Sequence, residues 1–157
     1  MRTLRNLAPG LALLAALALT GCGGGSPDAA LTPDGPASQQ PAADAPLTAT
    51  TWLVGSVAGV TAPDGRTRFT LTPDGRASGN LGCNRFSAPV TIDGTTVTLG
   101  PVTSTRMACE GPAGAVERAL TSLFGSGPLT WQVRAHTLTL TAPDGKTLTA
   151  EAGSAAE

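Results

Sequence analysis

Residues 68–99 read RFTLTPDGRASGNLGCNRFSAPVTIDGTTVTL and alternate strand signals with turn signals. The tripeptide Pro-Asp-Gly at 73–75 is typical of a tight turn, because Pro presets φ, Asp caps the turn and Gly accepts a positive φ. Ahead of it, Phe69 and Leu71 alternate with polar residues. Such period-two patterning between turns predicts short antiparallel strands with one face toward water.

The same turn signals recur along the chain. Pro-Asp-Gly stands again at 63–65 and 143–145, and Asp-Gly stands at 93–94. Apolar and polar residues also alternate in the segments 129–133 and 138–140. Because the intervals between the tripeptides differ, we interpret them as turns between hairpin strands rather than as a repeat architecture.

One segment, GPAGAVERALTSLFGSG at 111–127, breaks the alternation and has helical spacing. Pro112 fits the first turn and Gly125 fits the position after the last turn, while Glu117 and Arg118 are expected on the outer side. The apolar stripe consists of Val116, Ala119, Leu120 and Leu123. The expected fold class is therefore α+β, a strongly curled antiparallel β-sheet or partly closed β-barrel of about seven or eight short strands with one packed α-helix.

The N-terminus reads MRTLRNLAPGLALLAALALTGC, in which Arg2 and Arg5 precede an apolar stretch at 11–19 that is too short to span a bilayer stably. The stretch ends in Leu-Thr-Gly-Cys at 19–22, which resembles the lipobox of bacterial lipoproteins. The resemblance implies that the cysteine thiol receives a diacylglyceryl group and that the signal is cleaved just before it. An ordinary signal peptide, or a membrane helix cut short by three glycines, is the alternative.

We therefore expect three parts: a signal peptide at 1–21, a disordered Gly/Pro/Ala-rich tether at 22–48 and a folded domain at 49–155. The tether has no aromatic residue and cannot bury enough apolar surface to order itself. Cys22 is the expected lipid attachment site, and two or three acyl chains hold a protein on a membrane where one does not. This predicts a protein anchored in the cell membrane, with its domain on the extracytoplasmic side.

Two cysteines, Cys83 and Cys109, remain besides the lipidated one. An exported domain meets oxidising conditions, and an even count favours a disulfide, which would stabilise the fold by about 3.5 kcal/mol. Unpaired thiols or a metal site are the alternatives, although a zinc site needs four ligands and a redox motif needs Cys-x-x-Cys. We expect no metal and no cofactor. Phe86 and Met107, apolar neighbours of the cysteines, are expected in the core.

A family resemblance rests on these same residues. Gly-Cys-Asn-Arg-Phe-Ser at 82–87, Thr-Arg-Met-Ala-Cys at 105–109 and a helix carrying Glu117 closely resemble the META domain of HslJ-like heat-inducible bacterial lipoproteins. Trp52 matches the tryptophan that opens such domains, and the resemblance covers about residues 50–151. It implies a compact β-rich domain with one helix, exported, often lipidated and linked to envelope stress, with no established catalysis.

The residues themselves point away from an enzyme. From residue 49 onward, eight acidic side chains balance eight basic ones without a basic stripe, so a nucleic-acid partner is not expected. No Gly-x-Ser-x-Gly elbow occurs, and the single histidine, His136, is expected in a solvated turn between strands. Acidic residues stand mainly at turn tips. We expect a non-enzymatic, monomeric module that binds or stabilises an envelope protein or small ligand during stress.

Two other functions stay open. A small-ligand or lipid carrier would use the barrel interior, and a domain packed solid around Trp52, Trp131 and Leu123 would exclude it. A thiol-dependent enzyme would need a reactive Cys83 or Cys109.

A disulfide between the two cysteines would bring Asn84, Arg85 and Arg106 near one bridge. Two guanidinium groups placed close together can bind a phosphate or carboxylate bidentately, so these three residues are candidates for anion or partner binding. The competing interpretation pairs Arg106 with Glu117 or Glu110, while Asn84 bonds the turn backbone.

Overall fold

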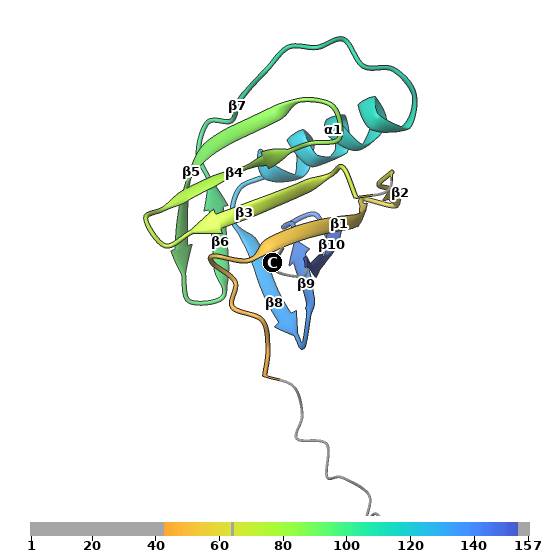
Figure 1. Ribbon diagram of the computed structural model, residues 1–157. Helices are drawn as coiled ribbons and strands as arrows, with labels where there is room; N and C mark the ends of the chain where they lie inside the picture. The colour runs from red at the N-terminus through yellow and green to blue at the C-terminus, as the bar shows by residue number, and fades with distance from the viewer. Residues whose placement is uncertain (1–42, 64, 154–157) are drawn as a thin grey trace, which may run out of the picture. The chain divides into compact units, whose positions relative to one another are not determined.

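The computed structural model describes residues 43–63 and 65–153, which form an antiparallel sheet and one helix (Figure 1). The helix α1 spans Gly111–Phe124. The strands are β1 Thr51–Val57, β2 Val60–Thr61, β3 Arg68–Thr72, β4 Arg76–Asn80, β5 Arg85–Asp93, β6 Thr96–Leu99, β7 Thr103–Ser104, β8 Leu129–Arg134, β9 Thr137–Thr141 and β10 Thr147–Ala152.

Eight of these strands close a barrel. Hydrogen bonding runs in the order β1-β3-β4-β5-β6-β8-β9-β10, and β10 pairs back onto β1 from Trp52 opposite Ala152 to Val57 opposite Leu148. The two-residue strands β2 and β7 pair with β1 and β5. The predicted fold class is confirmed, with full rather than partial closure, since both edge strands of the curled sheet find each other.

The predicted turns join neighbouring strands. Gly75, Gly94 and Gly145 have φ values of 82°, 53° and 85° between β3 and β4, β5 and β6, and β9 and β10. A left-handed backbone at these positions is open to glycine without a steric penalty. In the first Pro-Asp-Gly, at 63–65, Asp64 lies outside the described residues.

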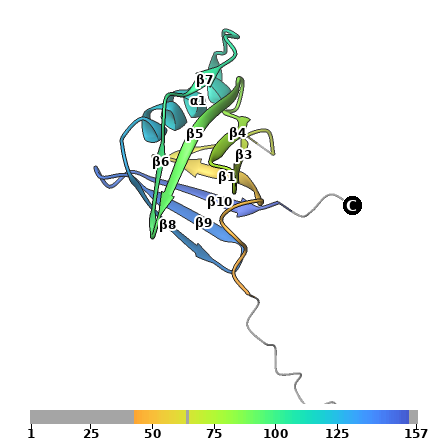
Figure 2. The ribbon, with the colours of Figure 1, turned by 90° about the vertical axis from the view of Figure 1, so that its left-hand side faces the viewer.

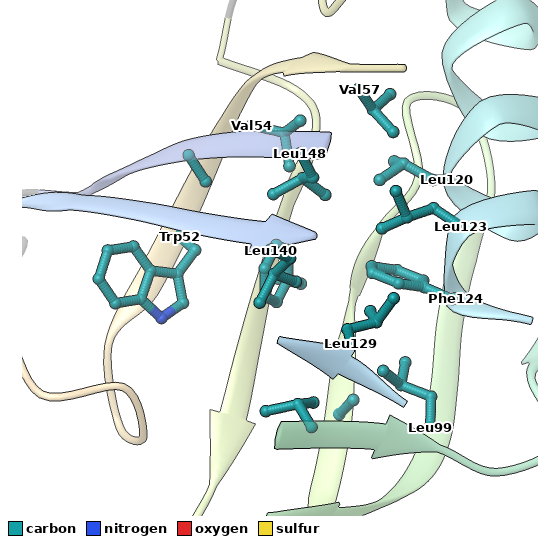
Figure 3. Packing of buried hydrophobic residues seen from close by; sticks show 14 of the residues in the cluster. Trp52, Val54, Val57, Leu99, Leu120, Leu123, Phe124, Leu129, Leu140 and Leu148 are labelled. Carbon is teal, nitrogen blue, oxygen red and sulfur yellow. The ribbon is translucent and has the colours of Figure 1, made fainter. Parts of the chain in front are cut away.

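The helix α1 lies at the end of the barrel toward β7, as Figure 1 and Figure 2 show. Its apolar side chains enter the barrel: in Figure 3, Leu120, Leu123 and Phe124 point toward Leu140 and Leu148 of the strands. The fully buried interior residues are Trp52, Val57, Leu71, Leu81, Val97, Leu120, Leu123, Phe124, Leu129, Leu138, Leu140 and Leu148. The expected helix and its packed stripe are therefore confirmed.

Trp131 packs against this interior but, unlike Trp52 and Leu123, it is not fully buried. It is half-buried on β8, and its indole Nε1 donates a hydrogen bond to the carbonyl of Gly94 at 3.1 Å. Trp52 is fully buried, and its Nε1 donates to the Leu47 carbonyl at 2.9 Å. The core is therefore packed around Trp52 and Leu123, and Trp131 lies partly buried against it.

Gly79 lets two strands approach closely between two aromatic residues. It lies opposite Phe69 on β3 and Phe86 on β5. A Cβ at Gly79 would stand 2.1 Å from the Arg68 carbonyl oxygen, so only glycine permits β3 and β4 to approach this closely. The rings of Phe69 and Phe86 then pack on Phe124 of α1, with centroids 5.8 and 5.6 Å apart.

The domain starts earlier than residue 49. Asp44 Oδ1 accepts a hydrogen bond from the Ala135 backbone N–H at 2.6 Å, Ala45 N–H donates to the Ala135 carbonyl at 2.7 Å, and Leu47 is buried. These residues pack on the barrel, whereas the patterning had assigned them to the tether. The signal peptide, Cys22 and the rest of the tether lie outside the described residues. The helix of the described part, α1, is neither long nor apolar enough to cross a bilayer.

Candidate functional site

Three segments meet beside the N-terminal half of α1. They are the β4–β5 corner, the segment that follows β7, and the helix itself. Cys83 and Cys109 join the first two in a disulfide, with their Cα atoms 6.3 Å apart, as the sequence predicted. Gly82, with a φ of 115°, lets the corner pass close to the helix, because a Cβ there would lie 3.0 Å from the Ala113 carbonyl oxygen.

Asn84 is the centre of the hydrogen bonds around this bridge, and it is only 3% exposed. Its Oδ1 accepts from the Met107 backbone N–H and from the Thr105 hydroxyl, both at 2.8 Å. Its Nδ2 donates to the Met107 carbonyl at 3.1 Å and to Glu117. Asn84 therefore bonds backbone, as one interpretation held, but the backbone is that of another segment.

Glu117 faces inward, contrary to the expectation that it lies on the outer side of the helix. It is half-buried, and its carboxylate accepts from Asn84 Nδ2 at 2.9 and 3.0 Å and from Asn84 N–H at 3.2 Å. The reason is that the β4–β5 corner covers this flank of α1. Arg118, one position further, is exposed as expected.

The proposed ion pairs of Arg106 do not form. Among the described residues, the salt bridge found joins Lys146 to Asp144. Glu117 is instead occupied by Asn84, and both Glu110 and Arg106 are exposed. The alternative in which Arg106 neutralises a helix carboxylate is therefore wrong.

Met107 is held by its backbone while its side chain faces water. Asn84 bonds both its N–H and its carbonyl, yet the Met107 residue is 66% exposed. The expectation that Met107 lies in the core is wrong, whereas Phe86 is buried as expected.

A cleft of about 620 Å³ opens beside these residues, on the outer face of β3, β4 and β5. Three arginines, Arg66, Arg68 and Arg85, line it together with Gly65, Gly79, Asn80, Gly82, Cys83, Met107 and Ala113. We call it the arginine cleft. The predicted set is thus divided: Arg85 lines the cleft, Asn84 lies buried beneath, and Arg106 is not among the described lining residues.

The sequence analysis did not identify Arg66 and Arg68 as candidate binding residues. Arg68 pairs with Asn80 across β3 and β4, and Asn80 pairs with Arg85 across β4 and β5. Side chains paired directly across neighbouring strands share one face of the sheet. The hairpin turn at 73–75 would have placed Arg68 near Asn80, but the pairing of β4 with β5 depends on the longer corner at 81–84.

The sulfurs of Cys83 and Cys109 and a carboxylate oxygen of Glu117 lie within 4.8 Å of one another. In the disulfide, neither sulfur is a thiolate, which is the form that binds metals. The Glu117 carboxylate already accepts three hydrogen bonds from Asn84. Three donors also fall short of the four that a structural zinc site uses.

Two carboxylates at turn tips have lowered pKa values. A hydrogen bond from the Thr72 hydroxyl lowers the pKa of Asp74, and hydrogen bonds from the Lys146 side chain and backbone lower the pKa of Asp144. Both groups are solvent-exposed, and their hydrogen bonds lie within the turns that contain them. His136 is exposed in the β8–β9 turn, as predicted.

Comparisons with known proteins agree with this fold. The family model described as META domain matches residues 45–154. An NMR structure of a protein from Burkholderia xenovorans is 26% identical, with a TM-score of 0.58 over 79% of this chain and 100% of that one. A second NMR structure, 23% identical with a TM-score of 0.56 over 68% of this chain and 91% of that one, shows the same fold. No curated protein matched.

Proposed function

The chain belongs to the META domain family, and we propose that it is a lipid-anchored protein of the cell envelope whose barrel binds or stabilises an envelope component during stress, without catalysis. The observation that carries this proposal is the structural use of the motif side chains. Cys83 and Cys109 are bonded to each other, and the polar groups of Asn84 and Glu117 satisfy one another. A nucleophile or general base needs a group free to react.

The lipobox-like Leu-Thr-Gly-Cys at 19–22 supports the anchor. Its cysteine follows an apolar stretch of the length found in signal peptides. The disulfide supports the extracytoplasmic side, because disulfides persist in oxidising compartments. A tether of Gly, Pro and Ala would separate the barrel from the headgroups.

Binding on the outer surface is favoured over carriage inside the barrel. Trp52, Leu140 and Leu148 from the strands, with Leu123 and Phe124 from α1, are fully or almost fully buried in the interior (Figure 3). A ligand in the interior would have to displace these side chains from a close-packed core.

The anchor is tested by feeding cells an alkyne-bearing palmitate analogue. We expect the full chain to take up the label and to sediment with membranes. Cys22→Ser should abolish the label, whereas Ser26→Ala, which leaves every cysteine in place, is the matched control and should keep it. An unlabelled wild-type chain would overturn the proposed anchor.

The stress role is tested in the source cell. Cells without the gene should lose survival after a heat pulse, and the wild-type gene should restore it. The gene carrying Cys22→Ser should restore less, because its product is not held at the membrane. Equal survival of deleted and wild-type cells would contradict the proposed role.

A further inference from the structure

We propose that the arginine cleft binds the phosphate group of an amphiphilic ester, with the apolar part of the ligand against Met107. This inference rests on the proposed binding role and names the ligand chemistry. Arg66, Arg68 and Arg85 supply the positive charge, and the Met107 side chain supplies the apolar wall.

The first argument is geometric. Arg68, Asn80 and Arg85 form one cross-strand row on β3, β4 and β5. Neighbouring strands are about 4.8 Å apart, so the two arginine backbones stand roughly 10 Å apart with Asn80 between them. Both guanidinium groups can therefore converge on one anion above Asn80. Guanidinium forks match the oxygen geometry of phosphate, which has enough oxygens for several of them.

Asn80 lies between the two arginines in this row and can offer a donor. Its Oδ1 accepts a hydrogen bond from the Gly82 backbone N–H at 2.7 Å. This bond occupies Oδ1 and leaves Nδ2 as the donor group of the side chain. The row then presents a guanidinium, an amide N–H₂ and a second guanidinium, all of which are donors.

The charge balance of the cleft is the second argument. Its described lining contains three arginines and no carboxylate, although the domain as a whole is neutral. In the described part of the chain, no salt bridge involves any of the three. Asp64, next to Gly65, lies outside the described residues. Like charges gathered in one cleft repel each other, and a bound anion relieves that repulsion.

The apolar wall is the third argument. Met107 lines the arginine cleft and also a second hollow of about 460 Å³ on the α1 side, lined by Cys109, Gly114, Glu117 and Arg118 among others. Its backbone is fixed by two hydrogen bonds to Asn84. An exposed methionine held in place beside a cationic cleft suits a ligand with adjoining anionic and apolar parts, because the thioether adapts to irregular apolar surfaces.

The test is isothermal titration calorimetry of the full chain in a nonionic detergent. The probes are hexyl phosphate, inorganic phosphate and hexanol. Hexyl phosphate should bind more tightly than either of the other two. Arg68→Gln and Arg85→Gln should each weaken the binding of hexyl phosphate by about tenfold, because each removes a charge-assisted hydrogen bond.

Arg76→Gln is the matched control. Arg76 is an exposed arginine at the other end of β4, opposite Thr72 and Pro89 rather than beside the cleft. The affinity of Arg76→Gln for hexyl phosphate should stay within about twofold of the wild-type value. Partitioning of hexyl phosphate into the detergent micelles is the same for all variants and does not affect the comparison. Met107→Gln should weaken the binding of hexyl phosphate while leaving the binding of inorganic phosphate unchanged. Equal melting temperatures of the variants show that folding is intact.

The same assay separates two sources of the phosphate ester. Displacement of hexyl phosphate by dihexanoyl phosphatidylglycerol, but not by dihexanoyl phosphatidylcholine, would assign an anionic lipid headgroup. Binding of hexyl phosphate without such displacement would assign a water-soluble ester. No binding, or equal affinity in wild type, Arg68→Gln and Arg85→Gln, would overturn the inference. Palmitate labelling and heat survival would be unaffected by that outcome, so the proposed function is judged separately.

Discussion

Asn84 and Glu117, 33 residues apart in the chain, are joined by hydrogen bonds from Asn84 Nδ2 to both carboxylate oxygens, at 2.9 and 3.0 Å. The bonds connect the β4–β5 corner to the helix that fills the barrel. Asn84 also bonds the Met107 backbone, so one buried amide ties together three segments. The disulfide between Cys83 and Cys109 reinforces the same junction.

Replacing Asn84 by Asp should lower the free energy of unfolding by about 3 kcal/mol at neutral pH, although the two side chains have nearly the same shape. The new carboxylate oxygen would face Glu117 and would leave the Met107 carbonyl without a donor. Urea denaturation measures the change. Glu117→Gln in the same chain should recover part of the loss, because it removes the repulsion. Glu110→Gln, at an exposed position, should change stability by less than about 0.5 kcal/mol. An Asn84→Asp protein as stable as wild type would show that the pair does not hold the helix.

Removing the disulfide should destabilise the domain by about 3.5 kcal/mol, because the bridge closes a loop of 26 residues in the unfolded chain. The Cys83→Ser/Cys109→Ser double variant is compared with wild type by urea denaturation, with Cys22→Ser as the unaffected control. Iodoacetamide followed by mass spectrometry should leave both cysteines unmodified in the native, unreduced protein. Alkylation of either would revive the hypothesis of a thiol-dependent enzyme.

Gly79→Ala should lower the free energy of unfolding by about 2–3 kcal/mol, since its Cβ would collide with the β3 backbone at the Arg68 carbonyl. Gly55→Ala on β1 is the matched control, because a Cβ there meets only the Thr149 carbonyl at an ordinary 3.8 Å. Thermal denaturation of both variants gives the comparison. Equal losses would mean that glycine is needed in these strands for a reason other than close approach.

Thr67→Val should raise the free energy of unfolding by up to about 1 kcal/mol. Thr67 is 1% exposed, and within the described residues its hydroxyl has no hydrogen-bond partner. Valine keeps the shape and removes the buried polar group that goes unsatisfied. Denaturation midpoints report the effect, and a loss of stability would instead reveal a partner for the hydroxyl.

The pKa of Asp144 should lie below the ordinary value of 3.8 and should rise in Lys146→Ala, because the Lys146 side chain donates the hydrogen bond that lowers it most, while the backbone donor at residue 146 remains. Asp74, whose pKa is lowered chiefly by Thr72, is the internal control and should not move. A carboxyl with a lowered folded pKa stabilises the fold at neutral pH, and this contribution disappears as the pH falls through that lowered value. NMR titration of the side-chain carboxyl carbons follows both groups, and an unchanged Asp144 in Lys146→Ala would contradict the assigned cause.

Most of the fold could be predicted because its signals are local. The turns at 73–75, 93–94 and 143–145, the period-two strands and the α1 stripe each depend on residues within one element. The failures concern neighbours in space. Glu117 has the polar character of an outward helix residue, yet Asn84 of the β4–β5 corner donates hydrogen bonds to it. Met107 is an apolar residue of a type common in cores, yet Asn84 holds its backbone and the side chain faces water.

The amino-acid sequence by itself determined the order of strands, turns and helix, and the two cysteines of the domain favoured a disulfide between them. These follow from backbone preferences and side-chain periodicity, which act over a few residues. Only the tertiary structure decided that β10 returns to β1, that Glu117 turns inward to Asn84, and that Arg68 and Arg85 share one cleft. Such meetings depend on how distant strands align when the sheet closes, and no local spacing in the chain specifies that alignment.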